Sequence, residues 1–195
     1  AQHIWFRPTA PVHNGRQQQR ETPGLVYIGA NQQGSRDAIA HFLADIWPSV
    51  LAEVPGVQVH IVGPVGHHLP SHLIGEGVKI CGLVPDLADF AGPDLIGLLP
   101  TRLMSGISIK VGEYLGLGLP IVAYPAGIDG YGDTLDGIVQ TAETPAAFAA
   151  TVIALLKDND ARQRLSKAGL KAAGTLLQNP EVVAALEDLA SVDRS

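Results

Sequence analysis

Residues 99–127 read LPTRLMSGISIKVGEYLGLGLPIVAYPAG, which is the pattern of a strand end, a loop, a helix and a second strand. We predict the helix over 109–117 and the second strand over 120–124. In the loop, Gly106 lets a backbone come close to a ligand, and Ser108 can cap the helix while its free amides face outward. Because a helix N-terminus of this kind can cradle a phosphate, the stretch predicts a strand–helix–strand unit that carries an anion site.

Two charged side chains on the predicted helix extend this interpretation. Lys110 lies in the first turn, where it can add positive charge beside a diphosphate, and Glu113 follows about one turn along the same face. A carboxylate at that position can accept hydrogen bonds from two ribose hydroxyls, so one short helix would hold the phosphates and the sugar of a nucleotide. From the residues alone, ordinary capping by Ser108 and a solvated Lys–Glu surface pair remain the alternatives.

Strand and helix patterns alternate on both sides of this stretch. Short apolar strands are predicted over 25–28, 57–62, 78–83, 94–98 and 137–140. An amphipathic helix with Phe42 and Trp47 on its apolar face follows the first strand, and Pro48 predicts a kink or a restart within it. Thr144 before Pro145 caps the first of three predicted tail helices, of which the others span 158–172 and begin at Asn179.

Short buried strands that alternate with helices are typical of a parallel sheet covered on both faces. We therefore predict an α/β, doubly wound, Rossmann-like domain with a mainly parallel sheet of about six strands, helices on both faces and a helical C-terminal tail. Residues 1–24, with several prolines and a run of glutamines, are interpreted as a linker or lead-in arm, and 25–195 as the domain. Ligands bind such sheets at the carboxyl ends of the strands, here the loops after Ile28, Val62, Leu83, Leu99 and Tyr124.

The composition narrows the classes of function. The 195 residues carry a formal net charge of -6, whereas nucleic-acid-binding domains are usually basic, which argues against that class. Hydrophobic residues make up 46% of the chain, enough for one domain with a sizeable core, and no apolar run approaches the length of a membrane-spanning helix. Cys81 is the single cysteine, so an internal disulfide is excluded and a cytoplasmic location is the default expectation.

Residues 99–127 as a whole resemble the donor-site segment of the family 4 retaining glycosyltransferases, which have the two-domain GT-B architecture. The positions that match are Pro100, Arg102, Gly106, Lys110, Val111, Glu113, Gly118, Pro120, Ile121 and Val122. The resemblance extends in order and spacing over roughly 25–173. It includes VKICGLVPDLADF at 78–90, which is similar to the family's strand beside the nucleotide base.

The resemblance implies that the chain is the C-terminal, donor-binding domain of an enzyme that transfers a hexosyl group from a UDP- or GDP-sugar to an acceptor hydroxyl with retention. A separate N-terminal domain would bind the acceptor, so this chain alone would bind nucleotide weakly and transfer no sugar. The chain's start at Ala1 agrees with an excised fragment. The family also implies that no cofactor or metal is permanently bound. It implies a cytoplasmic location and a role in polysaccharide or glycolipid synthesis, and it leaves open an association with the membrane through the other domain.

Site residues follow from the same resemblance. Glu113 would bind the donor ribose, Lys110 would stabilise the leaving diphosphate, and Arg102 would be a second diphosphate partner. The remaining candidates would act largely through the backbone: Ser105, Gly106 and Ile107 at the donor, Leu83 and Val84 beside the base, and Gly29 and Ala30 beside the sugar or diphosphate.

Two features of many family members are missing from this chain. Ser105 stands where they have the first of two glutamates separated by seven residues. The loop after the first strand reads ANQQG over 30–34, where they carry an Arg and a Lys that clamp the phosphates. These departures keep two alternatives open: another GT-B enzyme, such as a nucleotide-sugar 2-epimerase, and a non-catalytic nucleotide-binding or interaction module.

Other polar groups receive a structural interpretation. We expect a solvated, mobile loop at His67, His68 and His72, because Pro70 and Ser71 disfavour the helix that would align two histidines on a metal. Asp129, Asp133 and Asp136 are interpreted as turn-forming residues and Cys81 as a buried, inert thiol. A phosphoacceptor receiver domain is excluded because the first strand ends in Gly29-Ala30, without an aspartate cluster.

Overall fold

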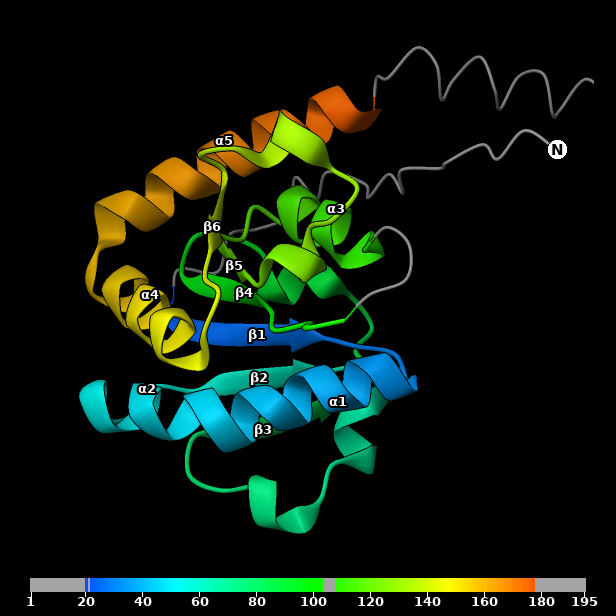
Figure 1. Cartoon of the computed structure of the whole chain (residues 1–195), viewed down its shortest axis with the longest axis vertical. Coiled ribbons are helices and arrows are strands. Elements are labelled where there is room, and N and C mark those ends of the chain that lie inside the picture. The colour runs from blue at the N-terminus through cyan, green and yellow to red at the C-terminus, as the bar shows by residue number, and fades with distance from the viewer. Residues whose placement is uncertain (1–19, 21, 104–107, 178–195) are drawn as a thin grey trace, which may run out of the picture.

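Six parallel strands form one sheet in the computed structural model, which describes residues 20, 22–103 and 108–177 (Figure 1). The strands are β1 Gly24–Ile28, β2 Val59–Val62, β3 Val78–Gly82, β4 Leu95–Leu99, β5 Ile121–Ala123 and β6 Val139–Thr141. Their order is β3-β2-β1-β4-β5-β6, and every pairing is parallel. This is the doubly wound order, in which strands are added on one side of β1 as far as β3 and then on its other side from β4 onward. The predicted fold class is therefore confirmed.

The described residues form five α-helices, of which the first three, with several short 3₁₀ segments, connect the strands and the last two follow β6. The α-helices are α1 Gln33–His41, α2 Trp47–Glu53, α3 Ile109–Gly116, α4 Pro145–Lys157 and α5 Asn159–Leu177. Short 3₁₀ segments cover Pro64–His68, Ser71–Leu73, Leu87–Phe90, Pro125–Gly127 and Gly132–Leu135. The second tail helix is longer than predicted, because it runs on to Leu177. The arm before residue 20 and the helix predicted from Asn179 lie outside the described residues.

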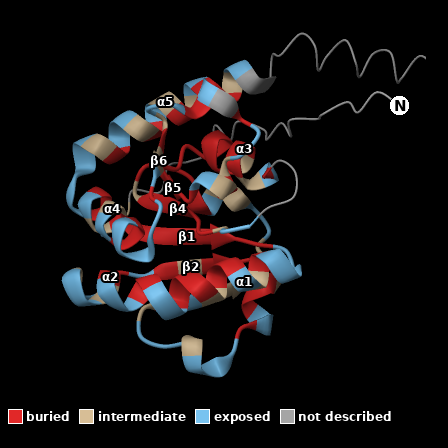
Figure 2. Cartoon of the chain, viewed as in Figure 1, coloured by how far each residue is buried: buried red, intermediate tan, exposed pale blue. Residues whose placement is uncertain are grey.

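The sheet separates two apolar cores because side chains alternate between its faces. Leu25 and Tyr27 of β1 pack with residues of α1, α2 and α4, whereas Val26 and Ile28 pack with Val111 and others of α3 and with α5. The inner strands β1, β2, β4 and β5 are almost entirely buried, and the outer surfaces of the helices are exposed (Figure 2). Helices therefore cover both faces, as the sequence predicted.

The helix that follows β1 is interrupted where the sequence placed Pro48. A π-helical segment at Phe42–Ile46 joins α1 to α2, and Pro48 lies in the first turn of α2, where its missing N–H leaves no intrahelical bond unmade. Phe42 and Trp47 are buried in the core between this helix and the sheet. The predicted restart at the proline is therefore confirmed.

The cap of α4 is also confirmed, because the Thr144 hydroxyl accepts a hydrogen bond from the Ala147 amide at 3.2 Å. The histidine segment differs from its prediction. His67, His68 and His72 are exposed, but their backbone forms two 3₁₀ helices rather than a loop, because the amides of Leu69 and Leu73 bond carbonyls three residues back.

Candidate functional site

A cavity of about 610 Å³ opens at the carboxyl edge of the sheet. It is formed by the loops after β1, β2 and β3 and by the first turns of α1 and α3. Its lining residues are Ile28, Gly29, Ala30, Gln32, Ser35, Val62, Gly63, Pro64, Leu83, Val84, Leu87, Ser108, Ile109, Lys110 and Glu113. This is the edge of the sheet, beside the β1–β4 reversal, at which doubly wound domains bind ligands.

Two glycines in the cavity wall bring the loops after β1 and β2 close together. Gly63 has a φ of 93°, and a Cβ there would lie 2.4 Å from the Gly29 carbonyl oxygen. The amide of Gly29 donates to the Val62 carbonyl at 2.9 Å, and the Val65 amide donates to the Gly29 carbonyl at 3.3 Å. Only glycine at Gly63 allows this approach, so the shape of the cavity depends on it.

Helix α3 is fixed against the ends of β1 and β4 by a fully buried tyrosine. The Tyr114 hydroxyl accepts a hydrogen bond from the Ile28 amide at 2.9 Å and donates to the Leu98 carbonyl at 3.3 Å. Gly97 makes room for the ring, because a Cβ there would lie 2.7 Å from Tyr114 Cδ2. These contacts hold the first turn of α3 beside β1.

The start of α3 is anchored from the other side by Tyr131, whose buried hydroxyl donates to the Ser108 carbonyl at 2.7 Å. Ser108 occupies the N-cap position, as expected, but its hydroxyl makes no capping hydrogen bond, which corrects the predicted cap. The first turn of α3 contains no acidic side chain. Its amide end therefore presents positive partial charge at the cavity that no carboxylate in that turn offsets.

Lys110 crosses from α3 to α1. Its ammonium donates to the Ser35 hydroxyl at 3.0 Å and lies 5.2 Å from the centroid of the Tyr27 ring. Burial lowers the pKa of Lys110, and the neighbouring Glu113 carboxylate acts in the opposite direction. An ammonium has three donors, so the bond to Ser35 leaves Lys110 able to bind a further acceptor in the cavity.

The structure brings six of the predicted site residues to this one cavity: Gly29, Ala30, Leu83, Val84, Lys110 and Glu113. Glu113 and Val84 are partly buried in its wall, whereas the Leu83 side chain is 82% exposed at its rim. Ser105, Gly106 and Ile107 lie outside the described residues. Sequence reasoning missed Gln32, Ser35, Gly63 and Leu87, although Gly63-Pro64 directly after a predicted strand was a signal for the second loop.

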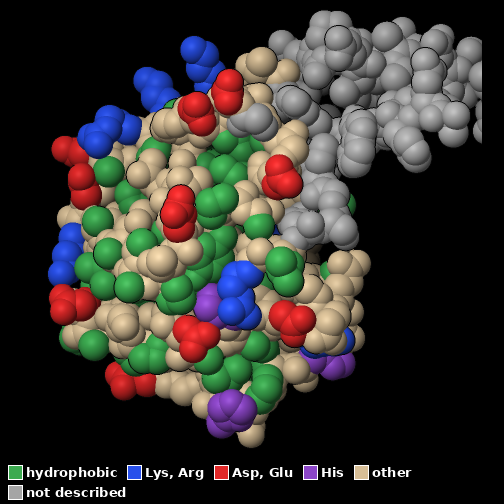
Figure 3. All heavy atoms as spheres, viewed as in Figure 1, with side chains coloured by type: hydrophobic (Ala, Val, Ile, Leu, Met, Phe, Trp, Pro, Cys, Tyr) green, Lys and Arg blue, Asp and Glu red, His purple; other side chains and the backbone are tan. Residues whose placement is uncertain are grey.

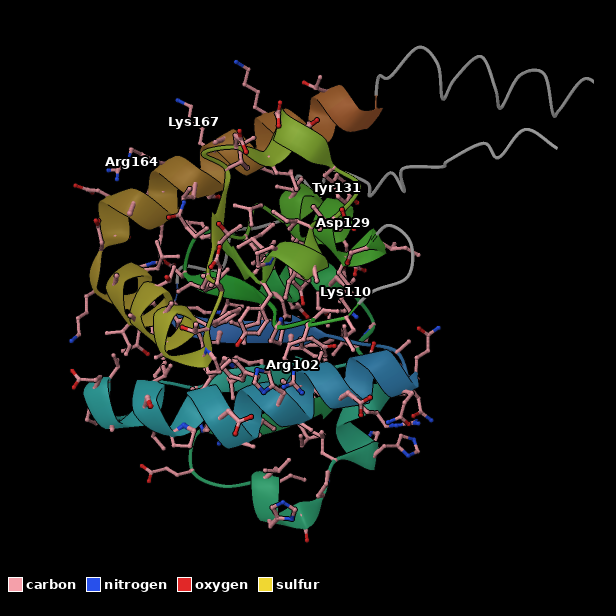
Figure 4. All side chains as sticks on the ribbon, viewed as in Figure 1. Arg102, Lys110, Asp129, Tyr131, Arg164 and Lys167 are labelled. Carbon is pink, nitrogen blue, oxygen red and sulfur yellow. The ribbon has the colours of Figure 1, made fainter. Side chains whose placement is uncertain are left out.

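Arg102 is the predicted site residue that does not reach this cavity. It is exposed and, together with His41, lines two cavities beside helix α1. Figure 4 labels its side chain over that helix. The loop after β4 carries it toward the face of the sheet covered by α1, whereas Lys110 belongs to the helix on the opposite face. Arg102 and Lys110 therefore line different cavities, and the role of Arg102 as a diphosphate partner stays a prediction.

The remaining polar groups are accounted for within the described residues. Cys81 is only partly buried, its sulfur lies 3.9 Å from His60 Nδ1, and burial raises the pKa of its thiol. Asp129 accepts a hydrogen bond from the Gly130 amide at 3.0 Å, as a turn-forming residue does. In residues 20, 22–103 and 108–177, no three His, Cys, Asp or Glu side chains lie close enough together to hold a metal ion.

No helix in the described part of the chain combines the length and the hydrophobicity that crossing a membrane requires.

Solved structures that share this fold include glycosyltransferases of the GT-B class. TarM superposes with a TM-score of 0.68 at 16% identity, covering 96% of this chain and 38% of TarM. Sucrose-phosphate synthase from Thermosynechococcus elongatus gives 0.67 at 18% identity, covering 88% of this chain and 45% of the synthase. The C-terminal domain of LpcC from Francisella tularensis gives 0.56 at 14% identity, covering 89% and 97% of the two chains.

The chain thus spans less than half the length of TarM and of the synthase but nearly all of an isolated C-terminal domain. No curated protein sequence matches it. The family described as "Glycosyl transferases group 1" matches residues 22–158, which is most of the chain and contains every described residue of the cavity wall. This chain belongs to the group 1 glycosyl transferases.

Proposed function

We propose that the chain is the donor-binding domain of a longer glycosyltransferase, which moves a hexosyl group from a UDP- or GDP-sugar to an acceptor hydroxyl with retention. One observation carries the proposal. Lys110 and Glu113, one turn apart on α3, line the same cavity as the glycine loops after β1 and β2. A cation, a carboxylate and close backbone at such spacing suit the phosphates and ribose of one nucleotide.

Charge in the cavity supports a diphosphate at its α3 end. Negative charge grows on the diphosphate as the bond to the sugar breaks, and the amides of α3 with the Lys110 ammonium would meet that charge. Because burial disfavours the charged form of Lys110, a bound anion would relieve this penalty and strengthen the interaction. Lys110 would thus act as the leaving-group stabiliser.

The other end of the cavity suits a nucleoside. Glu113 would accept hydrogen bonds from the two ribose hydroxyls, and the exposed Leu83 with Val84 would lie along the face of the base. One crystal structure of TarM from S. aureus holds UDP, which agrees with a nucleotide at this fold. The titration below identifies the base.

The acceptor and the location belong to the protein as a whole. We propose that a separate N-terminal domain binds the acceptor and completes the catalytic site, so that the chain described here binds donor nucleotide but transfers no sugar by itself. A cytoplasmic enzyme of polysaccharide or glycolipid synthesis fits this assignment. WaaG, described as a glycosyltransferase of lipopolysaccharide biosynthesis, shares the fold with a TM-score of 0.61 at 16% identity.

Calorimetric titration of the chain with UDP, GDP and ADP tests the proposal. We expect saturable binding of one of them, and Glu113→Ala should weaken it by about 1–3 kcal/mol, because a carboxylate that bonds two hydroxyls is lost. Glu53→Ala is the matched control, since Glu53 is an exposed carboxylate at the end of α2, away from the cavity. Binding that ignores Glu113→Ala, or no binding of any of the three nucleotides at millimolar concentration, would contradict the assignment.

A further inference from the structure

A second hollow lies at the same edge of the sheet, on the side of α1. Two adjoining cavities of about 450 and 460 Å³ share His41 and Arg102, and we call their combined space the Arg102 groove, defined by His41, Asp45, Thr101, Arg102, Tyr124 and Glu143. The first turn of α1 separates it from the nucleotide cavity, because Ser35 lines that cavity and the adjacent Gly34 lines the groove.

The wall of the groove is held rigid by three side chains in a row. His41 is 6% exposed, with Nδ1 at 2.7 Å from the Asp45 carboxylate and Nε2 at 3.0 Å from the Tyr124 hydroxyl. The rings of His41 and Tyr124 lie with centroids 5.7 Å apart. The row joins α1 to the end of β5, so both walls keep their spacing without a ligand, as a pre-organised site requires.

The charges in the groove select against ionic ligands. Among the described residues, Arg102 is the one Lys or Arg in its lining, which also includes three carboxylates, Asp37, Asp45 and Glu143. Figure 3 shows Lys or Arg atoms between acidic side chains at the place where Figure 4 labels Arg102. A phosphate would meet three like charges, and a cation would meet the guanidinium at close range.

Sugar hydroxyls match this mixture, because each hydroxyl both donates and accepts. They can donate to the carboxylates and accept from the guanidinium and from Thr101, while Pro125 and Leu73 offer apolar surface to the C–H faces of a pyranose. We propose that the Arg102 groove binds a neutral saccharide next to the nucleotide cavity. The proposal rests on the proposed function, because a sugar transferred by this domain would lie at the same sheet edge.

The neutral saccharide has two possible sources, which are the hexosyl group of the donor and the sugar of the acceptor. Amide NMR spectra of the ¹⁵N-labelled chain distinguish them. Glucose, galactose and N-acetylglucosamine are titrated separately, followed by UDP and UDP-glucose. Groove shifts at Gly34, Thr101 and Ala126 with free saccharides alone identify an acceptor subsite, whereas shifts that UDP-glucose produces and UDP does not identify the donor hexose.

Arg102→Ala should weaken the saccharide shifts by about tenfold or more, because charged hydrogen bonds are lost from the groove. The residue is exposed, so a thermal melt should show the variant to be folded. Tyr124→Phe, which releases His41 but keeps the ring, should weaken them less. Glu53→Ala is the control, because Glu53 is an exposed residue at the end of α2 that lines neither cavity, and it should leave the groove shifts unchanged.

Three outcomes would overturn the proposal. These are no groove shifts with any saccharide or with UDP-glucose, a preference for glucose 6-phosphate over glucose, and a loss of UDP affinity in Arg102→Ala, which would make Arg102 a diphosphate partner. A failure of the proposed function can be told apart from these outcomes, because UDP binding is followed by the shifts of Gly63 and Val84 in the other cavity.

Discussion

Replacing Tyr114 with Phe removes one hydroxyl from the point where α3 meets β1 and β4. The ring is fully buried, and the substitution keeps it, so the packing around Gly97 stays the same. The hydroxyl is the partner of the Ile28 amide at 2.9 Å and of the Leu98 carbonyl at 3.3 Å. The substitution therefore tests the two hydrogen bonds by themselves.

The expected loss in the free energy of unfolding comes mainly from the Ile28 amide. Ile28 is 9% exposed, so its N–H would be left without a partner and shielded from water, which costs about 1–3 kcal/mol. The longer bond to Leu98 adds less, because a carbonyl tolerates losing one of its partners better than an amide does. Each kcal/mol should lower the melting temperature by about 2–4 °C for a chain of this length.

Tyr27→Phe is the matched control. Its buried hydroxyl donates to the Ser35 carbonyl at 3.0 Å, and burial raises the pKa of Tyr27 to about 12. The Ser35 carbonyl lies within α1, where a helix amide is its second donor. Loss of the Tyr27 hydroxyl should therefore lower the free energy of unfolding by less than about 1 kcal/mol.

Urea unfolding followed by circular dichroism gives both free energies, with the dependence on urea unchanged if only stability is affected. Equal costs for Tyr114→Phe and Tyr27→Phe would refute the argument that an orphaned amide at the end of β1 dominates.

Three further substitutions test other parts of the domain. Lys110→Met should weaken UDP binding by about 1.5–3 kcal/mol in calorimetry but leave uridine nearly unaffected, and equal losses for both would contradict a phosphate contact. Burial, with smaller contributions from Arg20 and Lys79, lowers the pKa of His60 from 6.5 to about 4, so between these values the unfolded chain binds a proton that the folded chain does not. The free energy of unfolding should therefore fall as the pH falls from 6.5 toward 4, and His60→Asn should flatten that slope in urea titrations; an unchanged slope would show another group to be responsible. Arg162 is buried between α4 and α5, where it donates to the carbonyls of Leu155, Leu156 and Pro93. In the same assay, Arg162→Met should therefore lower the free energy of unfolding by more than about 2 kcal/mol, whereas the control Arg164→Met, at an exposed position, should lower it by less than about 0.5 kcal/mol. Similar losses for the two variants would contradict the capping role of Arg162.

The fold was predictable because the inner strands lie buried and every connection between strands crosses over as a helix or turn. Short apolar runs such as 25–28 and 94–98 are separated by helical segments, and this alternation permits few topologies. The cavity that Lys110 and Glu113 line was predictable in part for the same reason. Parallel strands end at one edge, so residues that follow them, such as Gly29 and Leu83, must meet there.

The Arg102 groove was not predictable, because its contacts join residues far apart in the sequence. His41 and Tyr124 are 83 positions apart, and the spacing of His41 in its helix points to Asp45 four residues later but not to Tyr124. The side of the sheet that Arg102 reaches depends on the path of the loop after β4, which no periodicity encodes. The resemblance of residues 99–127 to a family segment therefore placed Arg102 in the loop but did not indicate which cavity its side chain lines.

The missing phosphate clamp after β1 has a structural counterpart in the two helices that begin beside the cavity. The first turns of α1 and α3 both line it, and neither carries an acidic residue. Each helix N-terminus presents a partial charge of about +0.5, so two of them would supply about as much positive charge as one lysine. Lys110, which bridges from α3 to Ser35 at the start of α1, adds its full charge between them. An acidic chain without an Arg–Lys pair in this loop would thus still offer a diphosphate a local positive field, provided that Lys110 keeps α1 and α3 at their present spacing.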